Sequence, residues 1–381
     1  MELSLYEKSI KQEIDIIYNI TRVCPWDCAI CCVDALHVKK KNNSLIIRSE
    51  SLSKEEIYPR LSEEENIYEK ATNILINNKE ELSLEQKKQV IDNLEGFNVK
   101  IDISGGDALI NPQNIELLKY ASNKLGKENV TLTATGLGIA KYDIKMLASL
   151  VGEYNFTFDA EDIDDVANRP NAYAIGNLKI GEQFHKLNCS TRAELPLTTD
   201  IINRAHLVRL YKKLHERGID KLLIMRLFPV GRGMLLKEKI PSIEQYKLAI
   251  EVLLEQESKY GSPQIKLQCA LKHLFPQFNK HPGENPCDLV SNSFGITPNG
   301  TLLASPWAYN ASGKPLGEEW VLGNLSNQTL SEIFDSQKYK IMLSKVNENV
   351  GHCRIFSFFN SQKSLPIERI FDSADPLYNN L

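Results

Sequence analysis

The sequence predicts an α/β protein built as a partial (β/α)6 barrel with a small α+β C-terminal extension. Strand-like and helix-like segments alternate over the first 240 residues, as they do in parallel β/α units. Pro-rich and aromatic segments with short strands and turns replace this alternation afterwards. We therefore expect two domains, 1–240 and 241–381, of which the first is the barrel.

Six strand-like and six helical segments support the barrel. The strands are expected at 15–20, 98–104, 129–134, 154–158, 191–195 and 221–227, and the helices at 63–76, 84–94, 112–125, 141–150, 171–186 and 201–217. Because parallel strands joined by helices have crossovers of one hand, the sheet can curl on itself. Six such units predict an incomplete TIM-type barrel rather than a closed eight-stranded one.

The composition excludes several classes of protein. With 381 residues, of which 42% are hydrophobic and 25% charged, the chain resembles an ordinary soluble protein with a sizeable core. Its net charge of -4 gives no reason to expect nucleic acid or an anionic membrane as a partner. The sequence has no apolar signal core and no membrane-spanning stretch. Eight cysteines, half of them within residues 24–32, do not resemble a secreted disulfide framework, so we expect a cytoplasmic protein.

Cys24, Cys28 and Cys31 form a CxxxCxxC pattern directly after the first strand. Thiolates are soft ligands, and three of them in a short loop can bind an iron–sulfur cluster and leave one iron open to a small molecule. The alternatives are buried cysteines without a ligand, or a zinc knuckle. Zinc requires a fourth Cys or His at matching spacing, and Cys32 is too close to Cys31 to share a tetrahedral site with it. The spacing therefore favours the cluster.

The connection after this loop is unusually long, from Val33 to about Phe97. Its basic and polar start, 39–44, predicts a mobile surface loop. Segments rich in Glu and Lys follow, and they predict a solvated helical insertion over about 45–96. A lid over the substrate is the alternative, because loops on this rim of a barrel often carry function.

The later strands end in short polar or glycine-containing motifs. The second strand ends in Gly105-Gly106-Asp107, whose glycines allow positive φ and the close approach of a ligand. The third ends in Thr133-Ala134-Thr135-Gly136 and the fourth in Thr157-Phe158-Asp159. The fifth carries Arg192 and Glu194 on one face, because residues two apart share a side of a strand.

The sixth strand runs into Pro229-Val230-Gly231-Arg232, and this segment completes a resemblance to the radical S-adenosylmethionine (SAM) enzymes. The resemblance implies that Cys24, Cys28 and Cys31 bind a [4Fe-4S] cluster whose fourth iron binds the amino and carboxylate groups of SAM. It also implies cofactor contacts from residues near the cysteines and strand ends, namely Ile30, Gly105, Gly106, Asp107, Thr135, Thr157, Asp159 and Arg192. It identifies no catalytic residue.

The match to the family pattern is incomplete. Asp107 stands where the family has a glutamate, and Ile30 where it usually has an aromatic residue. Asp159 has a second interpretation as an N-terminal helix cap. Arg192 is expected either to pair with the SAM carboxylate or to form an internal ion pair with Glu194 or Asp159.

In the extension, Pro298-Asn299-Gly300 predicts a hairpin between two apolar runs, and a further strand and a helix follow. This order resembles the SPASM or twitch extension of radical SAM enzymes, whose cysteines hold auxiliary iron–sulfur clusters. Ser305 occupies the place of one of those cysteines. The remaining candidates are Cys269, Cys287 and Cys353, with His352 as an outside candidate. We expect the extension to keep its fold without a second cluster; the alternative is a cluster held by the three cysteines.

The resemblance implies an enzyme that reductively cleaves SAM to a 5′-deoxyadenosyl radical and abstracts hydrogen from its substrate. A SPASM-like extension favours peptide (RiPP) maturation or natural-product biosynthesis, with a flavodoxin- or ferredoxin-type reductant. Two expectations argue against a peptide substrate. We expect no leader-binding domain before Cys24, and we expect no second cluster that could accept an electron. One alternative is a redox-neutral epimerisation, decarboxylation or rearrangement of a small molecule such as a sugar or nucleoside. The other is a non-catalytic iron–sulfur binding module.

Overall fold

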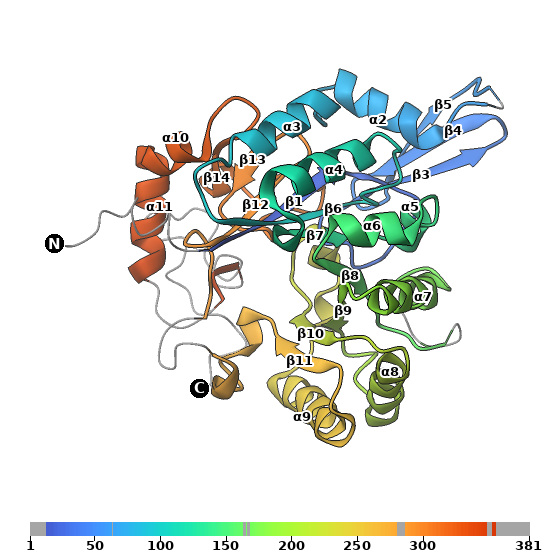
Figure 1. The fold of residues 1–381 in the computed structure, drawn as a ribbon, viewed down its shortest axis with the longest axis vertical. Helices are drawn as coiled ribbons and strands as arrows, with labels where there is room; N and C mark the ends of the chain where they lie inside the picture. Colours follow the sequence, from blue (N-terminus) through green and yellow to red (C-terminus); the bar gives the residue numbers. More distant parts are fainter. Residues whose placement is uncertain are drawn as a thin grey trace.

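A ten-stranded sheet with the order β11-β10-β9-β8-β7-β6-β1-β12-β13-β14 organises the protein. The computed structural model describes residues 13–62, 64–162, 165, 168–279, 286–348 and 353–355. Strands β11 to β6, β1 and β12 pair in parallel, and β13 and β14 are added antiparallel. Figure 1 shows helices α4, α6, α7, α8 and α9 following one another along the outside of the sheet. This arrangement is the predicted partial barrel.

The six predicted strands and six predicted helices are confirmed within a few residues. The strands are β1 (Ile14–Thr21), β6 (Val99–Gly105), β7 (Val130–Thr133), β8 (Glu153–Thr157), β9 (Ser190–Leu197) and β10 (Lys221–Arg226). The helices are α2 (Ile67–Asn77), α3 (Leu84–Asp92), α4 (Asn114–Leu125), α6 (Ile144–Leu150), α7 (Tyr173–Lys186) and α8 (Arg204–Glu216), and a short α5 (Gly136–Ile139) follows β7.

A further unit, which the sequence did not predict, follows the sixth strand. Helix α9 (Ile243–Tyr260) begins in a capping box of Ser242 and Gln245 and ends at Gly261, whose φ is 80°. It leads into β11 (Gln264–Leu267), which pairs in parallel with β10. The parallel sheet therefore continues past residue 240, and the division into domains at that residue stays a prediction.

Strand β1 is the centre of the core, since it pairs with β6 on one side and with β12 on the other. Its Ile14, Ile16, Tyr18 and Ile20 side chains are each at most 1% exposed. These four side chains share one face of the strand, because residues two apart point the same way, and Ile17 and Asn19 on the other face line the cavity inside the barrel. The cysteine loop follows β1 directly, so the most buried strand of the sheet positions that loop.

Residues 36–58 form a β-meander, which corrects two predictions, the mobile surface loop at 39–44 and the helical insertion from about 45. Strands β3 (Leu36–Lys41), β4 (Ser44–Ser49) and β5 (Lys54–Tyr58) are antiparallel to one another, and β3 also pairs with β2 (Val23–Cys24). The expected helices of the insertion, α2 and α3, come only after this meander.

The run of lysines in β3 conceals its alternation of buried and exposed side chains in the sequence. Val38, Leu45 and Ile47 are buried with residues of α2 in a second, smaller core. Strands β3 and β4 are joined at Asn42 and Asn43, whose φ angles are both positive, 47° and 55°. This conformation is that of a type I′ hairpin turn, which asparagine tolerates well.

The extension forms the predicted hairpin around Pro298-Asn299-Gly300, where Gly300 has a φ of 84°. Its elements are β12 (Ser293–Ile296), β13 (Thr301–Leu303), β14 (Val321–Asn324), α10 (Leu330–Asp335) and α11 (Gln337–Glu348). Because β12 pairs with β1, the extension continues the barrel sheet, as Figure 1 shows beside β1. In the part of the chain that the structure describes, no helix is long and apolar enough to cross a membrane.

Candidate functional site

A cavity of about 220 Å³ lies inside the barrel, where the cysteine loop meets the ends of β6, β7 and β8. It brings together most of the residues predicted from the sequence: Cys24, Cys28, Cys31, Ile30, Gly105, Gly106, Thr135, Thr157 and Arg192. Two predicted residues, Asp107 and Asp159, do not line it. In parallel α/β barrels, functional groups gather at this carboxyl end of the strands.

The cysteines at the cavity are free thiols. Cys24 ends β2 and is 5% exposed, whereas Cys28, Cys31 and Cys32 are half-buried and also line the cavity. Burial raises the pKa of Cys24 well above its ordinary value and that of Cys28 to about 12. Such thiols lose their protons when a metal binds to the sulfur, because coordination stabilises the thiolate.

The donor set fits a cluster better than a single ion. Among the described residues, no three Cys, His, Asp or Glu side chains surround one metal-ion position. A cubane cluster takes each cysteine at a different iron, so its ligands need not converge on one point. Three cysteines from one short stretch that line one cavity match that requirement.

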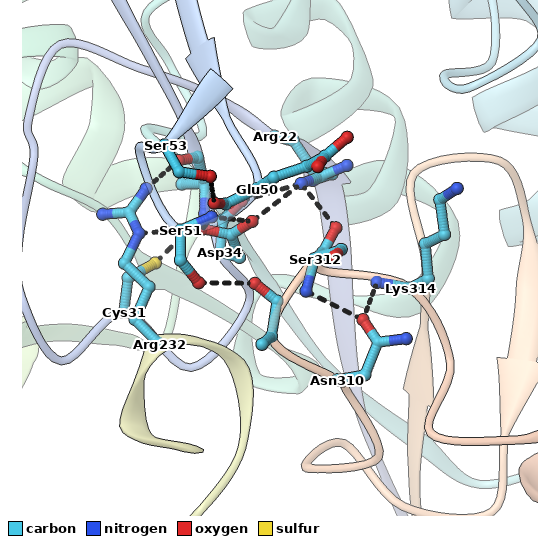
Figure 2. Close-up of polar contacts among 12 residues, drawn as sticks. Arg22, Cys31, Asp34, Glu50, Ser51, Ser53, Arg232, Asn310, Ser312 and Lys314 are labelled. Carbon is cyan, nitrogen blue, oxygen red and sulfur yellow. Dashed lines mark hydrogen bonds and ion pairs between the residues drawn. The ribbon is translucent and has the colours of Figure 1, made fainter. Parts of the chain in front are cut away.

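A buried ion-pair network supports the cysteine loop, the segment that carries Cys24, Cys28 and Cys31 (Figure 2). Its centre is Asp34, which is fully buried and has a φ of 45°. Arg232 donates from Nε to Asp34 Oδ1 at 2.8 Å and from Nη1 to the backbone oxygen of Cys28 at 2.7 Å. Arg22 donates from Nη2 to the backbone oxygen of Asp34 at 2.9 Å. The two guanidinium groups therefore hold the loop at Cys28 and at Asp34.

The same network reaches the β-meander and the extension. The backbone N–H of Ser51 donates to the Asp34 carboxylate at 3.2 Å, and the Ser51 hydroxyl donates to the backbone oxygen of Ala311 at 2.7 Å. Arg22 also donates to the backbone oxygen of Ser312 at 3.0 Å. Figure 2 shows these segments converging on Asp34 from different parts of the chain.

The glycine pair at the end of β6 allows close backbone contact with the start of the cysteine loop. A Cβ on Gly105 would overlap the carbonyl oxygen of Thr21, and one on Gly106 would overlap that of Val23. Gly105 has a φ of 131°, which disfavours any side chain. Only glycines therefore permit this approach of β6 to the loop, and their backbone groups face the cavity.

Asp107 points away from the cavity and organises the next turn. Its Oδ2 accepts hydrogen bonds from Thr135 Oγ1 at 2.6 Å and from the backbone N–H of Gly138 at 2.7 Å. Trp26 Nε1 in turn donates to Thr135 Oγ1 at 3.0 Å. Burial raises the pKa of Asp107 to about 6 although these hydrogen bonds oppose the shift. Through Thr135, Asp107 fixes an aromatic residue of the cysteine loop.

Asp159 forms an ion pair with Arg169 at 2.6 Å, and among the described residues it caps no helix. The N-cap of α7, the helix that follows it, is Ala172, so the cap interpretation of Asp159 is wrong. Arg169 lines the cavity and lies over the Tyr173 ring at 5.6 Å. Trp26 packs edge-on against Tyr173, with 5.4 Å between the ring centroids.

Sequence reasoning missed three of these residues, namely Trp26, Arg169 and Tyr173. All three line the cavity wall beside the cysteines. The position of Trp26 between Cys24 and Cys28 was the one local signal that pointed to this wall. Arg169 and Tyr173 reach the cavity only through the fold.

Arg192 has two partners inside the barrel. It contacts Glu153 at 3.2 Å and Glu194 at 3.3 Å. Of the two interpretations given for this arginine, the structure shows the internal ion pair with Glu194, and Asp159 pairs with Arg169 instead. Arg192 still lines the cavity together with Glu194.

The extension closes one side of the cavity. Ser305 is 2% exposed, and the next two residues, Pro306 and Trp307, line the cavity. Trp307 stacks on Phe228, with 5.0 Å between the ring centroids and 4° between the planes. Ser305, which stands at the cysteine position of the family pattern, is therefore buried, and Trp307 two residues later forms an aromatic wall of the cavity.

The three other candidate cysteines gather in the extension, although they are distant in sequence. The Cys269 thiol donates a hydrogen bond to Cys287, and this bond lowers the pKa of Cys287 to about 6 and raises that of Cys269. Cys353 is close enough to raise the pKa of Cys269 further, and Arg354 Nη1 donates to the backbone oxygen of Cys287 at 2.8 Å. His352 lies outside the described residues.

The partial parallel barrel, the CxxxCxxC loop at its mouth and the hairpin extension beside β1 make up the fold that the resemblance to the radical SAM enzymes with a SPASM extension leads us to expect. The SPASM family model, described as an iron-sulfur cluster-binding domain, matches residues 287–355. The predicted extension and the predicted fold are thereby confirmed.

Solved structures show the same fold. SuiB from Streptococcus suis has a TM-score of 0.63 at 13% identity, over 96% of this chain and 77% of that chain. Native anSMEcpe, solved with bound AdoMet and a Cp18Cys peptide, has a TM-score of 0.57 at 14% identity, over 95% and 94% of the two chains. SuiB bound to its precursor peptide SuiA has a TM-score of 0.57 at 15% identity, over 86% and 66%. No curated protein matches the chain.

Proposed function

We propose that this chain is a radical SAM enzyme that abstracts hydrogen from a peptide substrate, in RiPP maturation or related natural-product biosynthesis. The observation that carries the proposal is the convergence of Cys24, Cys28 and Cys31 with Gly105 and Gly106 on one cavity at the carboxyl end of a partial barrel. The cysteines are the proposed cluster ligands, and the glycine backbone is the proposed contact of the SAM amino group.

When bound, a reduced [4Fe-4S] cluster with SAM supplies a 5′-deoxyadenosyl radical, which abstracts hydrogen from a substrate carbon. The protein contributes orientation and the exclusion of water. Thr135 and Thr157 place hydroxyl groups at the cavity, and Trp26, Tyr173 and Trp307 cover it with aromatic surface. Ile30 adds an aliphatic contact beside the cysteines.

The other predicted site residues take supporting parts in this proposal. Asp107 keeps the Thr135 turn and Trp26 in place. Asp159 orients Arg169, which reaches the cavity and is the better placed arginine to meet the SAM carboxylate, because Arg192 is already held between two glutamates.

Two of the similar proteins support the choice of a peptide, because SuiB was solved with the precursor peptide SuiA and anSMEcpe with a Cp18Cys peptide. The eight free cysteines support a reducing compartment, for which we propose the cytoplasm. A flavodoxin- or ferredoxin-type protein is the proposed reductant.

The experiment is an iron and sulfide count after anaerobic reconstitution, followed by an assay for 5′-deoxyadenosine with SAM and dithionite. We expect about four irons per chain and product formation, both lost in the triple variant Cys24→Ala/Cys28→Ala/Cys31→Ala. The control is Cys189→Ala, since Cys189 is buried away from the cavity and should leave both readouts unchanged. An iron-loaded protein that never forms 5′-deoxyadenosine would instead identify a non-catalytic iron–sulfur module.

A second triple variant, Cys269→Ala/Cys287→Ala/Cys353→Ala, addresses the extension. If the extension holds no metal, this variant retains the full iron content of the wild type. A wild-type count of about eight irons that falls to about four in this variant would show that the extension holds a second cluster.

A further inference from the structure

The cavity continues below the proposed cofactor site into a polar layer inside the barrel. Asp102 of β6 lies three residues before Gly105, which places it about 10 Å deeper along the strand. Asp102, Thr133, Arg192 and Glu194 all line the same cavity as the cysteines. None of the motifs in the sequence pointed to Asp102.

The arginines around this layer have ion-pair partners, whereas Asp102 has none among the described residues. The three arginines that line the cavity each have a carboxylate partner: Arg169 pairs with Asp159, Arg192 with Glu153 and Glu194, and Arg232 with Asp34. Among the described residues, Asp102 has no ion pair. Its Oδ2 accepts one hydrogen bond, from Thr133 Oγ1 at 2.7 Å, and its buried Oδ1 accepts none.

The hydrogen bond from Thr133 goes to Oδ2 of Asp102, so Oδ1 stays open as an acceptor. Asn155 Nδ2 donates to Thr133 Oγ1 at 3.1 Å, so the Thr133 hydroxyl can donate only toward Asp102. The nearest charges, on Arg192, Glu194 and Glu153, belong to the ion pairs already described. A buried carboxylate left in this state is costly, because it has lost its water and gained no cation.

Apolar side chains line part of the same cavity. Ile17 of β1 pairs in register with Asp102, and Phe156, Leu223 and Met225 come from β8 and β10. A long side chain with a methylene stem and a charged end fits such a passage, because its stem packs on apolar surface while its end reaches the carboxylate.

We propose that Asp102 is the substrate-recognition residue of this cavity and binds the ammonium or guanidinium end of a lysine or arginine side chain in the peptide substrate. This inference rests on the proposed function, since it assigns the substrate class of the same cavity. The bound ammonium or guanidinium group supplies the cation that Asp102 lacks, and the stem of the bound side chain lies beside the proposed SAM site.

The test uses reconstituted enzyme with SAM at pH 8 and three probes, N-acetyl-Ala-Lys-Ala-amide and its norleucine and glutamate analogues. Equilibrium dialysis gives the dissociation constants. We expect the lysine tripeptide to bind at least tenfold more tightly than the norleucine tripeptide, which lacks only the ammonium group. In Asp102→Asn this preference should disappear, whereas the exposed carboxylate variant Asp335→Asn should keep it.

Equal affinity of the wild type for the lysine and norleucine tripeptides would overturn the proposal, as would a lysine preference that survives in Asp102→Asn. Failure of the proposed function is visible separately, because it appears as a wild-type protein without iron or without 5′-deoxyadenosine. If the wild type cleaves SAM but binds the lysine and norleucine tripeptides equally well, only the assignment of Asp102 is contradicted.

A melting experiment on the protein without peptide distinguishes binding from a structural role. Burial raises the pKa of Asp102 to about 7, so folding favours the protonated carboxyl group. The resulting stability is present at low pH and is lost as the pH rises through that value. Asp102→Asn should therefore melt no lower than the wild type at pH 8, with a smaller advantage at pH 5. A lower melting temperature at pH 8 would show that Asp102 supports the fold, and it would overturn the proposal.

Discussion

Gly231 is a residue at which the segment after β10 closely approaches the cysteine loop. Its φ is 51°, and its N–H donates to the backbone oxygen of Tyr309 at 3.1 Å. A Cβ at this position would overlap the carbonyl oxygens of both Cys31 and Cys32. The glycine of the Pro229-Val230-Gly231-Arg232 segment is therefore required by the loop that it touches, and it also places Arg232 at Asp34.

We expect Gly231→Ala to destabilise the protein by roughly 1–3 kcal/mol and to lower its iron content after reconstitution. The reason is that the loop must move away from the added methyl group. The control is Gly176→Ala within α7, where a Cβ meets no atom within 4 Å. This control should be neutral or stabilising by up to about 1 kcal/mol. Denaturant unfolding measures both variants, and equal stabilities would contradict the close contact.

At the scale of elements, the cysteine loop is held by segments that are not its neighbours in sequence. The β4–β5 turn contributes Ser51, and the extension contributes the backbone of Ala311 and Ser312. Ser51 and two arginines meet at Asp34, and the extension joins them through Ser51 and Arg22. The β-meander thus stabilises the cysteine loop, because Ser51 in its turn donates to Asp34.

Removal of the Asp34 carboxylate should be severe, because two buried guanidinium groups lose their partner. We expect Asp34→Ala to cost about 3–5 kcal/mol of unfolding free energy and Asp34→Asn to cost less, since an amide oxygen still accepts a hydrogen bond. Glu85→Ala removes an exposed carboxylate that pairs with Lys88, so it should change stability by less than about 1 kcal/mol. If Asp34→Ala unfolds at the same denaturant concentration as Glu85→Ala, the network does not stabilise the loop.

At the scale of the whole molecule, the barrel and the extension share one core. Strand β1 lies between β6 and β12, and the Phe294 side chain of β12 is fully buried beside Phe334 of α10. Val99 and Phe294 belong to the same hydrophobic cluster although they are distant from each other in the sequence. Shared burial of this kind predicts that the two parts unfold together.

Phe294→Ala should lower the free energy of unfolding by about 3–5 kcal/mol and keep a single calorimetric transition. The reason is that the cavity left in the extension also loosens β1. The control Ile57→Ala, at a side chain that is 60% exposed on β5, should shift the transition little. A new low-temperature transition in Phe294→Ala, with the original transition unchanged, would show that the extension unfolds alone.

Local sequence pattern was sufficient to predict most elements of the barrel and the hairpin of the extension. The period of apolar residues identified the strands and helices of the barrel, the spacing of Cys24, Cys28 and Cys31 identified the cysteine loop, and Pro298-Asn299-Gly300 identified the hairpin of the extension. These features are encoded within a few neighbouring residues. Local pattern failed at β3, where a run of lysines concealed a strand that is buried on one side only.

The pairing of polar groups, in contrast, depends on contacts between segments that are distant in the sequence. Arg232 and Asp34 are 198 positions apart, so no local pattern could pair them. The same is true of the partners that occupy Arg192, of the approach of Cys269 to Cys287, and of the missing cation beside Asp102. Each of these depends on the desolvation of charges by distant segments, which exists only after the sheet has closed around them.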